Sequence, residues 1–249
     1  MAGSTFASRS YRDIGIVLRT QKLGEADRII TVLTAFHGLV RAVAKGVRRT
    51  SSKFGATLEP FMVADLQFVH GRSLDIITQA QGRSAYGTAI AADYEKYTAA
   101  SAMAETAERL TETAQTADRS SFDLLHGACS ALARSVHPPD LVLVSYLLRA
   151  MSSAGWAVTW SECVACGAPG PQAGFHASAG GPVCADCRPP GSRNLPAGAP
   201  DFLHALQHGQ WETANDAASD LRHEALALVT DYAQHHLERR LTSLRAYAH

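Results

Sequence analysis

The sequence predicts an α+β protein with more than one domain: an N-terminal β-barrel of the OB type, then an α-helical domain with an inserted four-cysteine zinc segment. Three observations predict this class. Alternation of apolar and polar residues fills the first part of the chain, helical periodicity fills most of the rest, and two Cys-x-x-Cys pairs interrupt the helical part. The predicted boundaries are 1–87 for the barrel, 88–249 for the helical domain and 160–190 for the zinc segment.

The barrel is predicted from five short strands in about seventy residues, joined by turns. Residues 1–12 are rich in serine and alanine and are expected to form a flexible or edge-pairing lead-in. In the third strand, Arg41 and Lys45 share one face, and in the fourth strand Leu66 and Phe68 do so. The predicted strands are 13–19, 28–34, 39–45, 61–69 and 74–81. Five strands at this spacing match the OB barrel best.

The helical part is predicted from apolar residues at three- and four-residue steps. Asp93 is suited to cap the first helix, Ser120 or Ser121 opens the second, and the pair Pro138-Pro139 breaks it. Cys129 falls on the apolar face of the second helix and is expected to be a buried core thiol. The predicted helices begin near residues 93, 120, 140, 201 and 216.

The zinc segment is predicted from the spacing of four cysteines, since seventeen residues separate two Cys-x-x-Cys pairs. This is the spacing of a closed, tetrahedral, structural zinc site. The alternatives are a redox dithiol, a pair of disulfides, or His176 in place of one cysteine. Because four thiolates leave no open position, the metal is expected to stabilise the fold and to catalyse nothing. The predicted ligands of the single Zn²⁺ are Cys163, Cys166, Cys184 and Cys187.

Composition and charge narrow the classes of function. Hydrophobic residues make up 46% of the 249 residues and charged residues 18%, which is typical of a globular protein. No apolar run approaches a membrane span, the N-terminus lacks the apolar core of a signal peptide, and cysteine is sparse, so we expect a cytoplasmic protein. The sequence has no phosphate-binding loop, no H-E-x-x-H and no visible catalytic triad, so we expect no enzyme and no catalytic residues.

The charge is unevenly distributed along the chain. Residues 1–90 contain 12 Lys and Arg against 6 Asp and Glu, a balance of +6, and since the whole chain has 23 of each, the remainder has 11 against 17, a balance of −6. Such asymmetry indicates that the basic N-terminal part of the chain binds a polyanion.

A basic loop and the strand before it supply the candidate nucleic-acid contacts. Four of its cations lie within nine positions among Gly, Ser and Thr, a pattern suited to following a phosphate backbone without reading bases. The alternative is an ordinary solvated surface, and Phe54 is either a stacking platform or, more simply, a barrel anchor. The next candidates are Arg239, Arg240 and Arg245 at the C-terminal end. The predicted DNA-binding residues are Arg41, Lys45, Arg48, Arg49 and Lys53.

At these residues the chain resembles the bacterial recombination mediator family RecO. The order of a small basic barrel, helices, two Cys-x-x-Cys pairs and a terminal helix is more specific than any single motif. The matching stretches are Val17-Leu-Arg-Thr20, Gly24-Glu-Ala-Asp-Arg28, Leu33-Thr34, Gly38-Leu-Val-Arg-Ala42, Ala44-Lys-Gly46, Arg48-Arg49, Ser52-Lys53-Phe54, Leu58-Glu-Pro-Phe61 and Tyr146-Leu-Leu-Arg-Ala-Met151 followed by Gly155.

The resemblance implies an OB fold, a helical domain and, in many members, zinc. It implies binding of single- and double-stranded DNA, annealing of complementary strands, partnership with RecR, and help for RecA in replacing single-stranded DNA-binding protein on gapped DNA. It places such a protein in the cytoplasm, at the nucleoid. The alternative function is a zinc-ribbon protein of transcription or translation that binds RNA or a partner protein.

The resemblance also implies contact with the acidic C-terminal tail of single-stranded DNA-binding protein. A receptor for such a tail needs an apolar pocket with a cation at its mouth. Arg134, at the end of an apolar helix, and Arg149, one turn after Tyr146, are the predicted tail-binding residues; Arg109 and Arg119 are the other helical arginines considered. The alternative for Arg149 is an ion pair inside the helical bundle.

Overall fold

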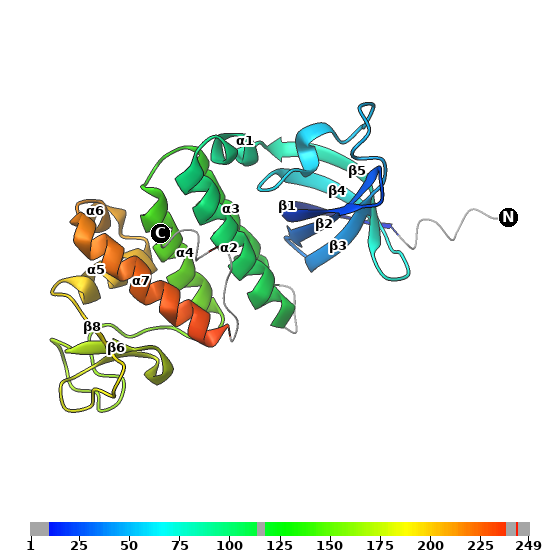
Figure 1. Cartoon of the computed structure of the whole chain (residues 1–249). Coiled ribbons are helices and arrows are strands. Elements are labelled where there is room, and N and C mark those ends of the chain that lie inside the picture. The colour runs from blue at the N-terminus through cyan, green and yellow to red at the C-terminus, as the bar shows by residue number, and fades with distance from the viewer. Residues whose placement is uncertain (1–9, 114–117, 238–242, 244–249) are drawn as a thin grey trace. The chain divides into compact units, whose positions relative to one another are not determined.

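A computed structural model describes residues 10–113, 118–237 and 243. The chain divides into two compact units, Met1–Arg134 and Ser135–His249, and each is described by itself (Figure 1). The predicted boundary between residues 87 and 88, which separates the barrel from the helical domain, stays a prediction. Among the described residues, no helix is both long and apolar enough to span a membrane.

The first unit begins with a closed barrel of five strands in the order β1-β2-β3-β5-β4, which confirms the predicted barrel. Neighbouring strands are antiparallel except β3 and β5, which are parallel. The one-turn 3₁₀ helix η2, Gly55–Leu58, lies between β3 and β4. The strands are β1 Ser10–Leu23, β2 Asp27–Thr34, β3 Gly38–Ala44, β4 Val63–Val69 and β5 Asp75–Ser84.

Alternation along the strands fills the barrel interior. On β3 the side chains of Val40, Ala42 and Ala44 are buried in the core, while Arg41 and Lys45 are exposed on the opposite face. This is the predicted arrangement, and it follows from the period of two in a strand. Phe54 is 3% exposed and belongs to the same core, so it anchors the barrel and is no stacking platform.

Several predicted strand boundaries were wrong: β1 runs past its predicted end at residue 19 to Leu23, and β5 runs past residue 81 to Ser84. β1 also begins earlier than predicted, at Ser10, because β4 supplies partners for residues 10–12, which therefore take the edge-pairing form of the lead-in. β4 begins at Val63 rather than at residue 61, because Phe61 has a φ of 65°, which a strand does not accommodate. The backbone N–H of Phe61 donates instead to the carbonyl of Val17 at 2.8 Å.

Three helices complete the first unit: α1 Tyr86–Ala91, α2 Tyr94–Thr113 and α3 Arg119–Ala133. Asp93 caps α2 as predicted, since its carboxylate accepts from the backbone N–H of Lys96 at 3.1 Å. The cap of α3 is Asp118 rather than a serine, and it accepts from the N–H of Ser120 at 2.9 Å. Helix α1 was not predicted, because six residues are too few to show a helical period.

Helices α2 and α3 pack against the outside of β1, β2 and β3. The carboxylate of Glu108 on α2 accepts hydrogen bonds from two N–H groups of the Arg19 guanidinium, at 2.7 and 2.8 Å. Thr31 and Leu33 alternate with the inward residues of β2, so they point outward, yet each is only 1% exposed. The outer face of β2 is therefore covered by the protein's own helices.

The second unit is built around α4, Pro139–Ser153, which packs against α5 and α7. Residues 141–148 of α4 are all buried, because partners lie on both sides of it. Two predicted starts were displaced: α5 begins two residues early, after Gly198 with a φ of 80°, and a short helix, α6, precedes α7. The other helices are α5 Ala199–His208, α6 Trp211–Asn215 and α7 Ser219–His236.

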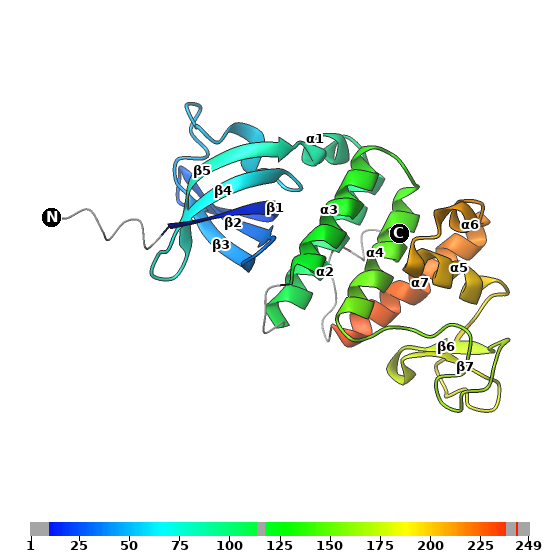
Figure 2. The same cartoon turned by 180° about the vertical axis from the view of Figure 1, so that it is seen from behind.

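The zinc segment, together with residues 193 and 194 just after its predicted end, forms a small sheet in the order β7-β6-β8, to one side of α4, α5 and α7 (Figure 2). Phe175 of β6 stacks on Trp160, with ring centroids 5.7 Å apart, and meets Tyr232 of α7 edge to face at 5.6 Å. These aromatic contacts and an ion pair between Arg193 and Asp231 fix the segment on α7. Its elements are β6 Gly174–His176, η3 Ala177–Ala179, β7 Gly181–Val183 and β8 Arg193–Asn194.

Candidate metal centre and nucleic-acid surfaces

The structure brings the four predicted metal ligands together. The sulfur atoms of Cys163, Cys166, Cys184 and Cys187 all lie within 4.8 Å of one another, and Cys166 and Cys184 are 3.9 Å apart. A tetrahedral zinc with Zn–S bonds of about 2.3 Å needs sulfur atoms about 3.8 Å apart. The donor set and its dimensions therefore fit a four-thiolate metal site.

Local backbone geometry explains why the first pair forms a knuckle. The N–H of Gly167 donates to the carbonyl of Cys163 at 2.8 Å, and Gly167 has a φ of 73°, which glycine adopts without strain. The N–H of Val164 donates to the carbonyl of Pro182 at 2.9 Å. This bond holds the first knuckle against β7, the strand that leads directly into the second cysteine pair.

The electrostatics of the site favour a thiolate at Cys163. Hydrogen bonds from the backbone amides, that of Cys184 first and those of Ala165 and Cys166 after it, lower the pKa of the Cys163 thiol to about 6. Amide donors stabilise the charged form, which is the form that binds a metal.

The alternatives to a metal site are weaker in the structure. No disulfide joins any of the five cysteines, all of which lie in described residues. The ring of His176 makes a hydrogen bond of 3.0 Å with Ser178, and the group that could hold a metal among the described residues consists of the four cysteines without it. Cys129 is fully buried in α3 as predicted, and burial raises its pKa to about 12, so it is unreactive.

The predicted DNA-binding residues fall into two groups in the structure. Arg41, Lys45 and Arg49 are exposed, and within the described residues no hydrogen bond or ion pair holds their charged groups. Arg48 and Lys53 are also exposed, but each binds backbone carbonyls. The guanidinium of Arg48 donates to the carbonyl of Glu25 at 2.8 Å, and the ammonium of Lys53 donates to that of Thr78 at 2.8 Å.

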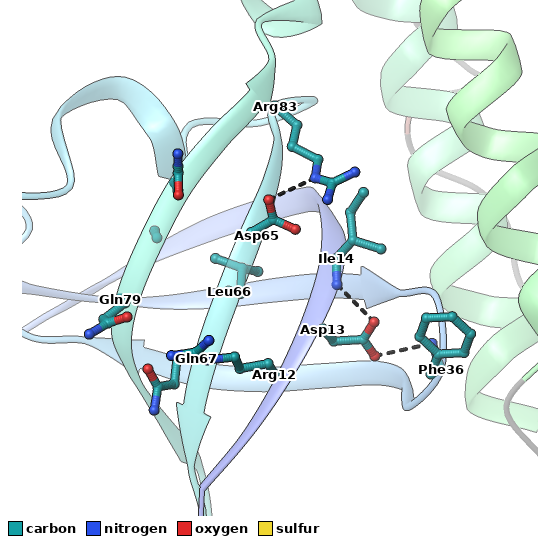
Figure 3. Close-up of a pocket in the computed structure, with 11 residues that line it drawn as sticks. Arg12, Asp13, Ile14, Phe36, Asp65, Leu66, Gln67, Gln79 and Arg83 are labelled. Atoms are coloured by element: carbon teal, nitrogen blue, oxygen red, sulfur yellow. Dashed lines mark hydrogen bonds and ion pairs between the residues drawn. The ribbon is translucent and has the colours of Figure 1, made fainter.

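A groove that the sequence did not reveal lies on the outer face of β1, β4 and β5; we call it the β1–β4–β5 groove. It encloses about 700 Å³. Its floor consists of outward side chains of the three strands, and Phe36, from the turn between β2 and β3, lines one end (Figure 3). The strand residues that characterise it are Arg12, Asp65, Gln67, Gln79, Gln81 and Arg83.

Comparison with known proteins identifies the family. A family model for the N-terminal part of recombination protein O matches residues 9–86, and one for its C-terminal part matches residues 91–245. The chain belongs to the RecO family. Membership supports a recombination mediator role in DNA repair, with DNA binding, and the barrel and the cysteine cluster agree with it. It favours this role over the alternative of a zinc-ribbon protein of transcription or translation.

The structure places the two candidate tail-binding residues of this RecO family member in different units. Arg134 ends α3 in the first unit, and Arg149 lies on α4 in the second; both are exposed. Exposure argues against the alternative of an Arg149 ion pair inside the bundle. Tyr146 and Leu148 beside Arg149 are only 3% and 2% exposed, so they present little apolar surface. Arg239, Arg240 and Arg245 lie outside the described residues.

Proposed function

We propose that this RecO family member binds single- and double-stranded DNA, anneals complementary strands and, with RecR, helps to load RecA onto DNA coated by single-stranded DNA-binding protein. The observation that carries the proposal is the family match over both parts of the chain. Because its substrate is then chromosomal DNA, its expected place of action is the nucleoid in the cytoplasm.

The proposed phosphate-binding surface is the basic loop with the exposed face of β3. Arg41, Lys45 and Arg49 supply cations with no competing partner among the described residues, and Arg48 and Lys53 add charge while they shape the loop. Cations that contact only phosphates bind DNA of any sequence and bring two strands together without selecting bases. This is the property that annealing requires.

The proposed metal is one structural Zn²⁺ held by the four cysteines. Four thiolates complete a tetrahedral shell, so the ion would have no open position for a substrate. Its role is to fold residues 160–190, whose connecting loops are rich in Gly and Pro. We accordingly propose that the protein acts by binding rather than by catalysis.

The proposed partner contact is between the acidic tail of single-stranded DNA-binding protein and an arginine of the helical part, Arg134 or Arg149. Both guanidinium groups are exposed and available to a carboxylate. Arg134 is the more accessible of the two to an apolar tail end, because the apolar neighbours of Arg149 are buried.

An annealing assay tests the proposed function. Complementary single strands, one carrying a fluorophore and one a quencher, are mixed bare or coated with single-stranded DNA-binding protein. The protein is expected to accelerate pairing in both cases, and RecR is expected to increase its effect on RecA loading onto the coated strand. Absence of acceleration on bare strands, by folded protein that contains zinc, would contradict the proposal.

A further inference from the structure

The face that OB barrels ordinarily use for nucleic acids is partly covered in this protein, because its β2 portion lies under helices. That face is centred on the second and third strands. Here α2 and α3 pack on it, and Thr31 and Leu33 on the outside of β2 are 1% exposed. The β2 portion of that face therefore offers no contact to unpaired bases. The β1–β4–β5 groove lies on a different part of the barrel surface (Figure 3).

A row of polar side chains crosses this groove. Arg12 of β1 lies opposite Gln67 of β4 in register, and Gln67 lies opposite Gln79 of β5. In Figure 3, Arg12 and Gln67 lie between Gln79 at one end of the view and Phe36 at the other. Neighbouring strands are about 4.8 Å apart, so the row spans about 10 Å. That length corresponds to about three stacked bases, at about 3.4 Å for each.

The groups in this row are available to a ligand. Among the described residues, no hydrogen bond holds the amides of Gln67, Gln79 and Gln81 or the guanidinium of Arg12. The acidic groups in the groove are occupied. Asp65 pairs with Arg83 at 2.7 Å, and the buried carboxylate of Asp13 accepts from three backbone N–H groups and lies 2.6 Å from the His37 ring.

One end of the groove carries an exposed aromatic ring. Phe36 is 60% exposed, and the Arg119 guanidinium lies 5.1 Å from its centroid. Aromatic rings, amides and a few cations are the groups that bind unpaired bases, by stacking and by hydrogen bonds to base edges. A duplex hides those edges inside its own grooves, so base-edge contacts in the β1–β4–β5 groove favour an unpaired strand.

We propose that the β1–β4–β5 groove binds an unpaired DNA strand through its bases. One base stacks on Phe36, the glutamine amides bind base edges, and Arg12 binds a phosphate. The groove adjoins the basic loop, because the ammonium of Lys53 is bound to Thr78, the residue before Gln79. A strand held by phosphate contacts at the loop can thus continue into the groove. This inference rests on the proposed DNA-binding function and adds selectivity for single strands to it.

Equilibrium binding of a labelled single-stranded oligonucleotide, and of the duplex made from it, tests the proposal with the full-length protein. Phe36→Ala is expected to weaken single-strand binding by about 5- to 150-fold. The double variant Gln67→Ala with Gln79→Ala is expected to weaken it too. Neither change removes a cation, so duplex affinity and the salt dependence should stay as in the wild type. Tyr94→Ala, at a ring that is 74% exposed on α2, and Gln21→Ala, at an exposed amide outside the groove, are the matched controls.

Two results would overturn the proposal for the groove. In one, the groove variants bind the single strand as tightly as the wild type does; in the other, they lose affinity for single strand and duplex equally. Groove variants that bind the single strand normally but no longer bind the acidic tail peptide would also overturn the proposal and would assign the groove to a protein partner. Failure of the wild type to bind any DNA would instead overturn the proposed function, so the two failures are distinguishable.

Discussion

Removal of the three exposed cations that have no polar partner in the described part of the chain is the sharpest test of the basic surface. The variant is Arg41→Ala, Lys45→Ala and Arg49→Ala combined. These side chains make no polar contact among the described residues, so the change should leave the barrel folded. Arg48 is different, because its guanidinium holds the carbonyls of Gly24 and Glu25 at 3.3 and 2.8 Å.

The expected magnitude follows from counterion release. Each phosphate contact on duplex DNA contributes about 0.9 to the slope of log K against log salt. At about 0.1 M salt one contact is therefore worth about 8-fold in affinity, and three contacts are worth about 500-fold with a slope change of about 2.7. Arg48→Ala should change the slope less and should also lower the free energy of unfolding, by about 0.5–1.5 kcal/mol.

Fluorescence anisotropy of labelled duplex DNA at several salt concentrations gives both affinity and slope. The control for loss of one charge is Arg72→Ala, at an exposed turn between β4 and β5, which is compared with the single variant Arg49→Ala. The DNA affinity of Arg72→Ala should differ from that of the wild type much less than the affinity of Arg49→Ala does. Wild-type affinity and slope in the triple variant would refute the reasoning. The cations at residues 239, 240 and 245 would then be tested next.

Four further predictions concern the metal, the partner and the fold. Cys163→Ser should reduce bound zinc below about half an equivalent and lower stability, because metal binding and folding are coupled; full zinc occupancy on metal analysis would contradict the site. Arg134→Glu or Arg149→Glu should weaken binding of the acidic tail peptide and leave annealing of bare DNA intact, and unchanged tail affinity in both folded variants would exclude this placement. Asp118→Ala should cost about 1 kcal/mol in urea unfolding. Hydrogen bonds from Ser120 lower the pKa of Asp118 in the folded protein. The stabilisation by the cap is therefore present above the ordinary Asp pKa of about 3.9 and is lost as the pH falls through the lower folded value. A difference in unfolding free energy between wild type and Asp118→Ala that persisted in strong acid would be inconsistent with the cap. Glu108→Ala should cost about 1–3 kcal/mol, because Glu108 is largely buried and binds the Arg19 guanidinium with both oxygens; a cost near zero would show that the pair does not stabilise α2 on the barrel.

Local patterns determined much of this protein from the sequence alone. The spacing of the four cysteines predicted the cluster, because each Cys-x-x-Cys pair forms its own knuckle and only the joining of two knuckles depends on the fold. Alternation predicted which face of β3 carries Arg41 and Lys45, since the strand period is fixed by the backbone. Residues of the barrel and of α4 were enough to indicate the family that the matches over 9–86 and 91–245 then showed.

Strand register and helix packing decided what sequence patterns could not. Arg12, Gln67 and Gln79 are far apart in the chain and meet only because barrel closure pairs β1 with β4 and β4 with β5. Arg48 resembled its neighbour Arg49 in sequence, but only the folded loop places one beside backbone carbonyls. Covering of β2 by α2 and α3 likewise depends on packing between distant segments. Such contacts are set by the closure of the whole barrel, and no local spacing in the sequence records them.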